Sequence, residues 1–146
     1  MALTDVVGAG PVAVDTALFI YLIEEHPRYL SAVRPLFEEA DAGRRRLVTS
    51  AVTLLEVLVV PYRAGDRELA ARYEVLLANS RGLRLVDIDR SQLRAAAQLR
   101  AGYGLRTPDA LQIAAAIGEG CTVLVTNDQA LRSIPGLQVI QLSRHL

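Results

Sequence analysis

The chain has 146 residues, of which 51% are hydrophobic, so it is long and apolar enough for one domain with a proper core. Sixteen acidic residues balance sixteen basic ones, and every basic residue is arginine, which excludes a P-loop lysine and a Schiff-base lysine. The single Cys121 excludes an intrachain disulfide and a cysteine-rich zinc site. No apolar run is long enough to span a membrane and the first residues do not resemble a signal peptide, so we expect a cytoplasmic protein.

Short apolar segments alternate with helical ones along the chain. We expect strands over residues 12–14, 47–49, 83–86, 122–126 and 137–140. We expect helices over residues 17–25, 28–40, 51–60, 66–78, 91–100 and 107–117, with Pro61 ending or kinking the third and a short helical turn reaching Ser133. This alternation predicts an α/β fold with a parallel sheet and right-handed crossovers. Residues 1–11 are expected to be an N-terminal extension, and residues 12–146 a single domain.

Two of the expected strands end on carboxylates. The first strand leads directly into Asp15, and the fourth ends at Thr126, Asn127 and Asp128. If these two strands are neighbours on either side of the point where the strand order reverses, both acids face the crevice in which open α/β sheets bind ligands. The alternatives are that Asp15 is only a helix N-cap and that Asp128 is only a turn residue.

Two further acids lie on expected helices. Asp109 is in the first turn of a helix that starts at Thr107 and Pro108, with the threonine as its cap. Asp109 could therefore be no more than an acid that complements the helix dipole. Glu56 has no comparable structural explanation, because an acid in an apolar helix is costly to bury unless it is paired or coordinated.

Four carboxylates in one place would repel one another and raise one another's pKa values. With no lysine available, the simplest compensation is a divalent cation with oxygen ligands, for which Mg²⁺ or Mn²⁺ is suitable. Such an ion can activate water and offset charge at a phosphodiester. Thr16 and Asn127 could orient ligands or the attacking water, and Thr126 could brace the loop.

Four segments, taken together and in this order, resemble the PIN-domain family: residues 14–16, 50–56, 107–114 and 125–128. Within that family the chain is most similar to the VapC-type ribonuclease toxins of bacterial toxin–antitoxin pairs. The resemblance implies a three-layer α/β/α sandwich around a central parallel sheet, and RNA cleavage that depends on Mg²⁺ or Mn²⁺. It places the family's acidic, metal-binding positions on Asp15, Glu56, Asp109 and Asp128, and its helper positions on Thr16, Thr126 and Asn127.

The resemblance also implies partners and a mechanism. Asp15, Glu56 and Asp109 would bind the cation directly or through water, and Asp128 would complete the cluster or position a second ion. A water activated by the metal would attack the phosphodiester. A homodimer is implied, held in check by a cognate antitoxin whose tail enters the acidic groove. We expect apolar residues of the early helices, among them Phe19 and Phe37, to cover a partner.

Other functions remain open from the sequence. A phosphatase of the haloacid dehalogenase type is a weak alternative, because Ala17 stands where that family needs a second aspartate. A non-catalytic interaction module, whose acidic groove binds a basic partner peptide, is an alternative from a different class. Arg44, Arg45 and Arg46 form either a solvated turn or a contact to RNA phosphates.

Overall fold

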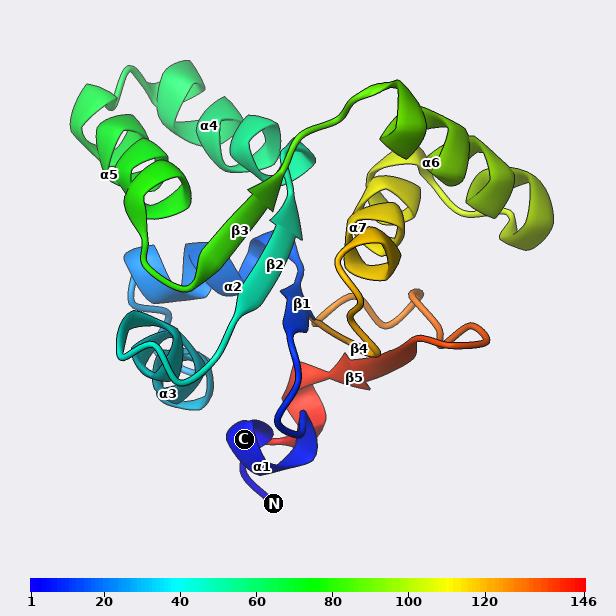
Figure 1. Cartoon of the computed structure of the whole chain (residues 1–146). Helices are drawn as coiled ribbons and strands as arrows, with labels where there is room; N and C mark the ends of the chain where they lie inside the picture. The colour runs from blue at the N-terminus through cyan, green and yellow to red at the C-terminus, as the bar shows by residue number, and fades with distance from the viewer.

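The computed structural model describes residues 1–146 as three layers, with a five-stranded parallel sheet between two layers of helices (Figure 1). The strand order is β3-β2-β1-β4-β5. The strands are β1 (Val12–Val14), β2 (Leu47–Ser50), β3 (Leu83–Val86), β4 (Val123–Thr126) and β5 (Gln138–Gln141). The predicted α/β/α sandwich with a central parallel sheet is confirmed, and so is the adjacency of the first and fourth strands.

The three central strands are buried on both faces, as the sequence pattern requires for a parallel sheet. Every residue of β1, β2 and β4 is buried, and these strands are continuous runs of small, β-branched or apolar residues. The edge strands β3 and β5 are only partly buried. The strand order reverses between β1 and β4, which puts the ligand-binding crevice at their carboxyl ends.

Helices cover the two faces unequally (Figure 1). One face is covered by α1 (Leu3–Val6), α2 (Thr16–Ile23), α3 (Leu30–Asp41), α4 (Val52–Ala64) and α5 (Arg67–Asn79). On the other face lies α7 (Thr107–Gly118), with α6 (Arg90–Tyr103) packed on it. A 3-10 turn over Leu142–Arg144 follows the last strand. None of these helices is both long and apolar enough to cross a membrane.

Pro61 does not end its helix, contrary to one of the two outcomes expected from the sequence. The helix α4 runs on to Ala64 and ends at Gly65, whose φ of 68° is a left-handed C-cap. Pro61 is buried where α4 packs beside α5, and this burial offsets the backbone hydrogen bond that a proline cannot donate. The short helical turn expected before Ser133 is also absent, and this segment consists of turns and an isolated bridge.

The early helices do not present their phenylalanines to a partner. Phe19 and Phe37 are buried in the main core, with ring centroids 5.3 Å apart in an edge-to-face contact. Four large apolar side chains are instead exposed on α4, at Leu55, Val59, Val60 and Tyr62. The expectation of a partner surface on the early helices is therefore wrong for the two phenylalanines.

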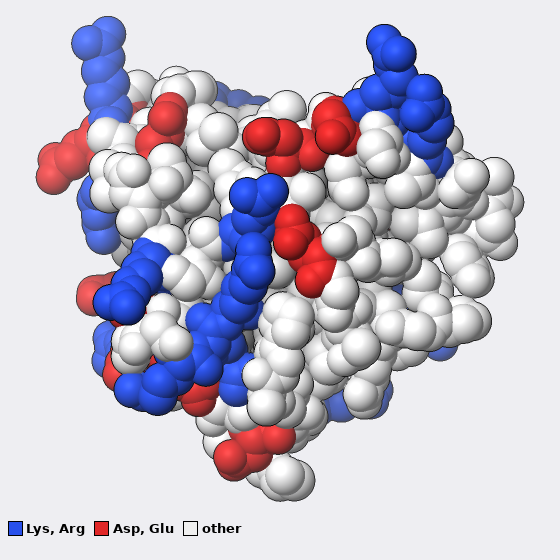
Figure 2. All heavy atoms as spheres, viewed as in Figure 1, with Lys and Arg blue, Asp and Glu red and all other residues white.

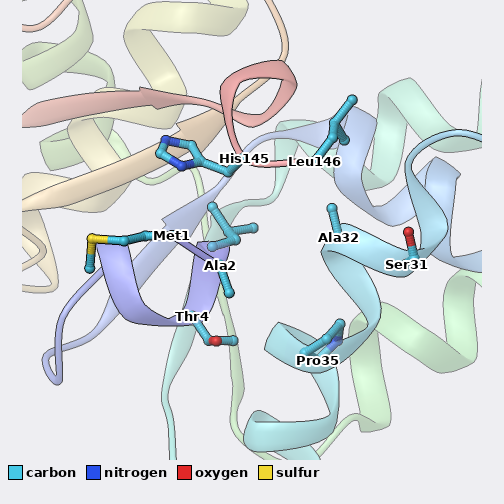
Figure 3. A pocket seen from close by; sticks show the side chains of 9 residues that line it. Met1, Ala2, Thr4, Ser31, Ala32, Pro35, His145 and Leu146 are labelled. Atoms are coloured by element: carbon cyan, nitrogen blue, oxygen red, sulfur yellow. The ribbon is translucent and has the colours of Figure 1, made fainter.

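The first residues of the chain pack onto the domain. Leu3 and Val7 are 2% and 4% exposed and belong to the main core cluster. The two chain ends lie at the same side of the molecule (Figure 1). There, residues of α1, α3 and the C-terminus surround a pocket of about 410 Å³, with Met1 and Leu146 on opposite sides of it (Figure 3).

We predict that Leu3→Ala lowers the free energy of unfolding by about 2–5 kcal/mol, the usual cost of truncating a buried leucine. Urea denaturation measures this change. The control is Leu55→Ala, where the leucine is 64% exposed and the change should stay within about 0.5 kcal/mol. Equal effects of the two substitutions would show that the N-terminal residues do not contribute to the core in solution.

Candidate active site

The ends of the neighbouring strands β1 and β4 carry the first two acids. Val14 is in register with Val125, so Asp15 and the segment after Thr126 emerge side by side. The buried Thr126 hydroxyl donates a hydrogen bond of 2.7 Å to Asp15 Oδ2, and it accepts one of 3.1 Å from the backbone N–H of Asp128. One threonine therefore ties both acidic loops together.

Asp15 also caps the next helix, and the adjacent Thr16 is hydrogen-bonded to the third acid, Glu56. Asp15 Oδ1 accepts a hydrogen bond of 2.8 Å from the backbone N–H of Thr16, so the residue is the N-cap of α2 as well as a lining residue of the site. The Thr16 hydroxyl donates to Glu56 Oε1 at 2.7 Å. This bond brings a glutamate of α4 to the carboxyl end of β1.

A buried polar network lies behind these residues, and sequence analysis did not predict it. Gln112 of α7 donates from its side-chain amide to the Thr53 hydroxyl at 2.7 Å, and Thr53 lies 3.2 Å from the Thr16 hydroxyl. Thr49 of β2 lies 2.7 Å from Thr53 and donates to the Val14 carbonyl at 2.8 Å. Since these side chains are buried and hydrogen-bonded to one another, they fix α4 and α7 relative to the sheet.

Asp109 completes the set from the other helical layer. It lies in the first turn of α7, which begins one residue after Arg106; the N-cap is this arginine rather than Thr107 as expected. All four acids line one pocket of about 330 Å³. The complete lining is Asp15, Thr16, Ala17, Ile20, Glu56, Arg106, Pro108, Asp109 and Asp128.

The sequence profile of the PIN domain matches residues 12–137, which include every one of these pocket residues. The chain belongs to the PIN domain family. The family that the sequence motifs resemble is thereby confirmed.

Several solved structures share this fold at low sequence identity. The VapBC2 structure of Rickettsia felis, bound to a promoter DNA fragment, aligns with a TM-score of 0.68 and 20% identity over 90% of this chain and 98% of that one. VapC20 of Mycobacterium tuberculosis, a toxin that cleaves the sarcin–ricin loop, gives 0.66 and 16% over 82% and 91%. DNA-bound VapBC of Salmonella typhimurium gives 0.63 and 23% over 91% and 98%. A comparison with curated protein sequences finds no significant match.

Arg106 is the one charged residue of this PIN-domain pocket that sequence analysis missed. Its Nε donates to Asp109 Oδ2 and its Nη2 to Asp128 Oδ2, both at 3.0 Å. The arginine side chain is 71% exposed, whereas those of Asp109 and Asp128 are 13% and 31% exposed. The spacing of three residues to Asp109 was readable on a helix, but the contact to Asp128 depends on the tertiary fold.

The two remaining helper residues do not line the pocket. Thr126 is completely buried beneath Asp15. Asn127 turns away from the acids, since its Nδ2 donates to the Tyr21 hydroxyl at 3.0 Å. The Asn127 Oδ1 is buried without a hydrogen-bond partner. In this arrangement Thr126 orients a carboxylate directly, while Asn127 contacts α2 rather than the acids.

Burial and mutual repulsion perturb two of the acids at the base of the pocket. Burial raises the pKa of Asp15, and the carboxylates of Asp109 and Asp128 raise it further, against the hydrogen bonds from Thr126 and Thr16. Burial also raises the pKa of Glu56, and Asp15 and Asp109 add to this effect. The Thr16 hydrogen bond and the Arg106 charge oppose it. The pocket therefore holds negative charge at a free-energy cost.

The donor chemistry of the pocket fits an oxygen-preferring divalent cation. Its potential ligands are the carboxylates of four different elements, with no thiolate or imidazole among the lining residues. As the side chains stand, no three of them are grouped closely enough to enclose an ion. The positive charge between Asp109 and Asp128 is supplied by Arg106.

We predict that Asp15→Asn, measured in EDTA, raises the free energy of unfolding at pH 7. The native state binds the Asp15 proton more tightly than the unfolded chain does, because its pKa is raised above 3.8. Wild-type protein therefore loses stability as the pH rises from 3.8 through the native pKa, whereas asparagine does not titrate. Urea denaturation at several pH values measures the difference, which should shrink towards low pH.

The matched control is Asp66→Asn, which makes the same change at the exposed N-cap of α5. This variant should not share the gain at neutral pH, because the exposed carboxylate stays hydrated and its charge costs little. A stability difference for Asp15→Asn that is the same at every pH would contradict burial of charge as the cause.

Proposed function

We propose that this PIN domain is a metal-dependent endoribonuclease that acts in the cytoplasm as the toxin of a toxin–antitoxin pair. The observation that carries the proposal is the convergence of Asp15, Glu56, Asp109 and Asp128, from four separate elements, on one pocket at the strand-order reversal. Two of these acids, Asp15 and Glu56, are held with raised pKa values by burial, and acids that cost stability in this way are expected where function requires them.

In this proposal Asp15, Glu56 and Asp109 hold Mg²⁺ or Mn²⁺, and Asp128 completes the set. A bound divalent ion would polarise a water and offset the negative charge of a phosphodiester. The hydroxyl of Thr126 fixes one oxygen of Asp15, and the hydroxyl of Thr16 fixes one oxygen of Glu56. Each carboxylate keeps a second oxygen or lone pair for a ligand, held in a defined direction by its threonine.

Arg106 has two roles in the proposed site. Without a metal ion, its guanidinium neutralises Asp109 and Asp128 by bridging them. With a cation bound to these acids, the exposed arginine is free to turn towards the phosphate group of the substrate, for which its planar fork is suited. Arg106 would thus neutralise two of the acids when no cation is bound, and would contribute positive charge at the reacting phosphate when one is bound.

The toxin assignment draws on the PIN-domain structures with the same fold, among which are toxin–antitoxin complexes and a toxin that cleaves the sarcin–ricin loop. We propose that a cognate antitoxin and a second copy of the chain are the protein partners. The exposed apolar side chains of α4, with Leu55, Val60 and Tyr62 each more than 60% exposed, are available for such contacts.

The interaction module is kept as the second candidate because of one contact. Arg106 shows that Asp109 and Asp128 accept a guanidinium group with two hydrogen bonds. A basic peptide could bind in the same way and would need no metal ion. Metal dependence therefore separates the two functions.

We predict that purified protein, free of any antitoxin, cleaves RNA in Mg²⁺ or Mn²⁺ and that EDTA abolishes the cleavage. Loss of a residue that only supports a metal ligand lowers activity by about 10–100-fold. Asp15→Asn and Glu56→Gln should lower the cleavage rate by more than this, because each replaces a proposed ligand itself. Gel analysis of total RNA, followed by end mapping of the fragments, measures the effect.

The control for Glu56→Gln is Glu74→Gln, the same change at an exposed site on α5. This variant should cleave as wild type does. Cleavage that survives both EDTA and Asp15→Asn would rule out the proposed site. A folded wild-type protein that binds a basic peptide but neither Mn²⁺ nor RNA would favour the interaction module.

A further inference from the structure

A second charged region lies at the amino ends of the strands, whereas the acids lie at their carboxyl ends. The loops that precede β1, β2 and β3 form a groove of about 550 Å³ at the amino ends of these strands. Its lining consists of arginine, glycine and two other small residues: Ala9, Gly10, Pro11, Gly43, Arg44, Arg45, Arg46, Arg81 and Gly82. The strands are three or four residues long, so their amino and carboxyl ends lie about 10–13 Å apart.

The groove has a fixed shape, because its loops are fastened together. Gly82 has a φ of 78°, and a side chain there would collide with the backbone of Ala40 at the end of α3. The Arg45 side chain is only 7% exposed, pairs with Glu39 at 2.8 Å and donates to the Gly8 carbonyl at 2.8 Å. Arg45 therefore holds the loops in place and is not available to a ligand.

The other arginines carry unbalanced positive charge. Arg44 and Arg81 are exposed and have no acidic side chain within ion-pair distance. Arg46 and Arg84 share a single carboxylate, that of Glu119, at 3.7 and 3.1 Å, and both remain more than half exposed. Figure 2 shows arginines in a band across the face that Figure 1 presents over β2 and β3.

The lining suits the phosphates of a nucleic-acid strand better than it suits an acidic peptide. Guanidinium groups match phosphate with paired hydrogen bonds, and the chain has no lysine to provide a less directional charge. The groove contains no aromatic and no large apolar side chain, so it offers neither a platform for bases nor an anchor for a peptide. A ligand held there would be recognised by its regularly spaced charges alone.

We propose that the groove arginines Arg44, Arg81 and Arg46 bind the phosphate backbone of an RNA strand outside the acidic site. Arg84 of β3, which shares Glu119 with Arg46, extends this binding surface. The inference rests on the proposed function, since RNA is the substrate considered for the acidic pocket. Zero net charge does not oppose it, because four arginines line this groove while four acids line the separate pocket at the other end of the strands. Binding in the groove is independent of base sequence. It adds affinity that increases with RNA length, while the acidic pocket binds the phosphodiester that is cleaved.

The test is the binding of fluorescently labelled oligouridylate in EDTA, where no cleavage is needed. Arg44→Ala combined with Arg81→Ala should weaken binding of a long oligouridylate roughly tenfold at low salt. The slope of log affinity against log salt should become shallower by about 0.7 for each phosphate that the variant no longer neutralises. The loss of affinity should grow with the length of the oligouridylate, because a longer strand reaches more of the groove's arginines.

The control is Arg63→Ala combined with Arg94→Ala, which removes the same charge from exposed positions on α4 and α6. An equal loss of affinity in this control would overturn the proposal, because the effect would then be one of overall charge. Unchanged RNA binding by the groove variant, or a groove that binds oligoglutamate but not RNA, would overturn it too. Failure of metal-dependent cleavage is a separate result, since it concerns the acidic pocket and not binding in EDTA.

Discussion

The hydrogen bond from Thr126 to Asp15 depends on the pairing of β1 with β4, and the whole acidic pocket depends on that pairing. The strand order reverses between these two strands, and in open α/β sheets this is the point at which a crevice opens outside the carboxyl ends of the strands. Acids placed there are half-buried against one another at a cost that hydroxyl donors only partly offset. This cost supports the proposal that the acids serve a ligand of opposite charge rather than the stability of the fold.

All basic residues of the chain are arginines, and these pair with acids in two different ways. At the carboxyl edge, Arg106 bridges Asp109 and Asp128 and is exposed enough to leave them. At the amino edge, Arg45 is buried and structural, whereas its neighbours in the groove are exposed and underpaired. Although the total charge is balanced, the groove at the amino ends of the strands is lined by arginines and the pocket at their carboxyl ends mainly by acids. In the proposed function the acidic edge performs the chemistry, and the basic edge supplies affinity.

Much of this arrangement could be predicted from sequence because it follows from local patterns. Continuous apolar runs identified the strands, and isolated acids at their ends marked Asp15 and Asp128 as candidates that share one crevice if their strands are neighbours. What could not be predicted depends on tertiary contacts. The four-residue helix α1 has no periodicity to detect, yet Leu3 reaches the core. The ion pair of Arg106 with Asp128 and the Gln112–Thr53 hydrogen bond join elements whose packing no single segment specifies.

The central claim is that the four acids form one cation site from which Arg106 withdraws. A crystal structure of the protein soaked in Mn²⁺, with the ion located by its anomalous scattering, tests it most directly. We predict a peak among Asp15, Glu56 and Asp109, with Arg106 turned away from Asp109 and Asp128. A saturating soak that leaves the arginine bridge intact and places no ion in the pocket would contradict the claim.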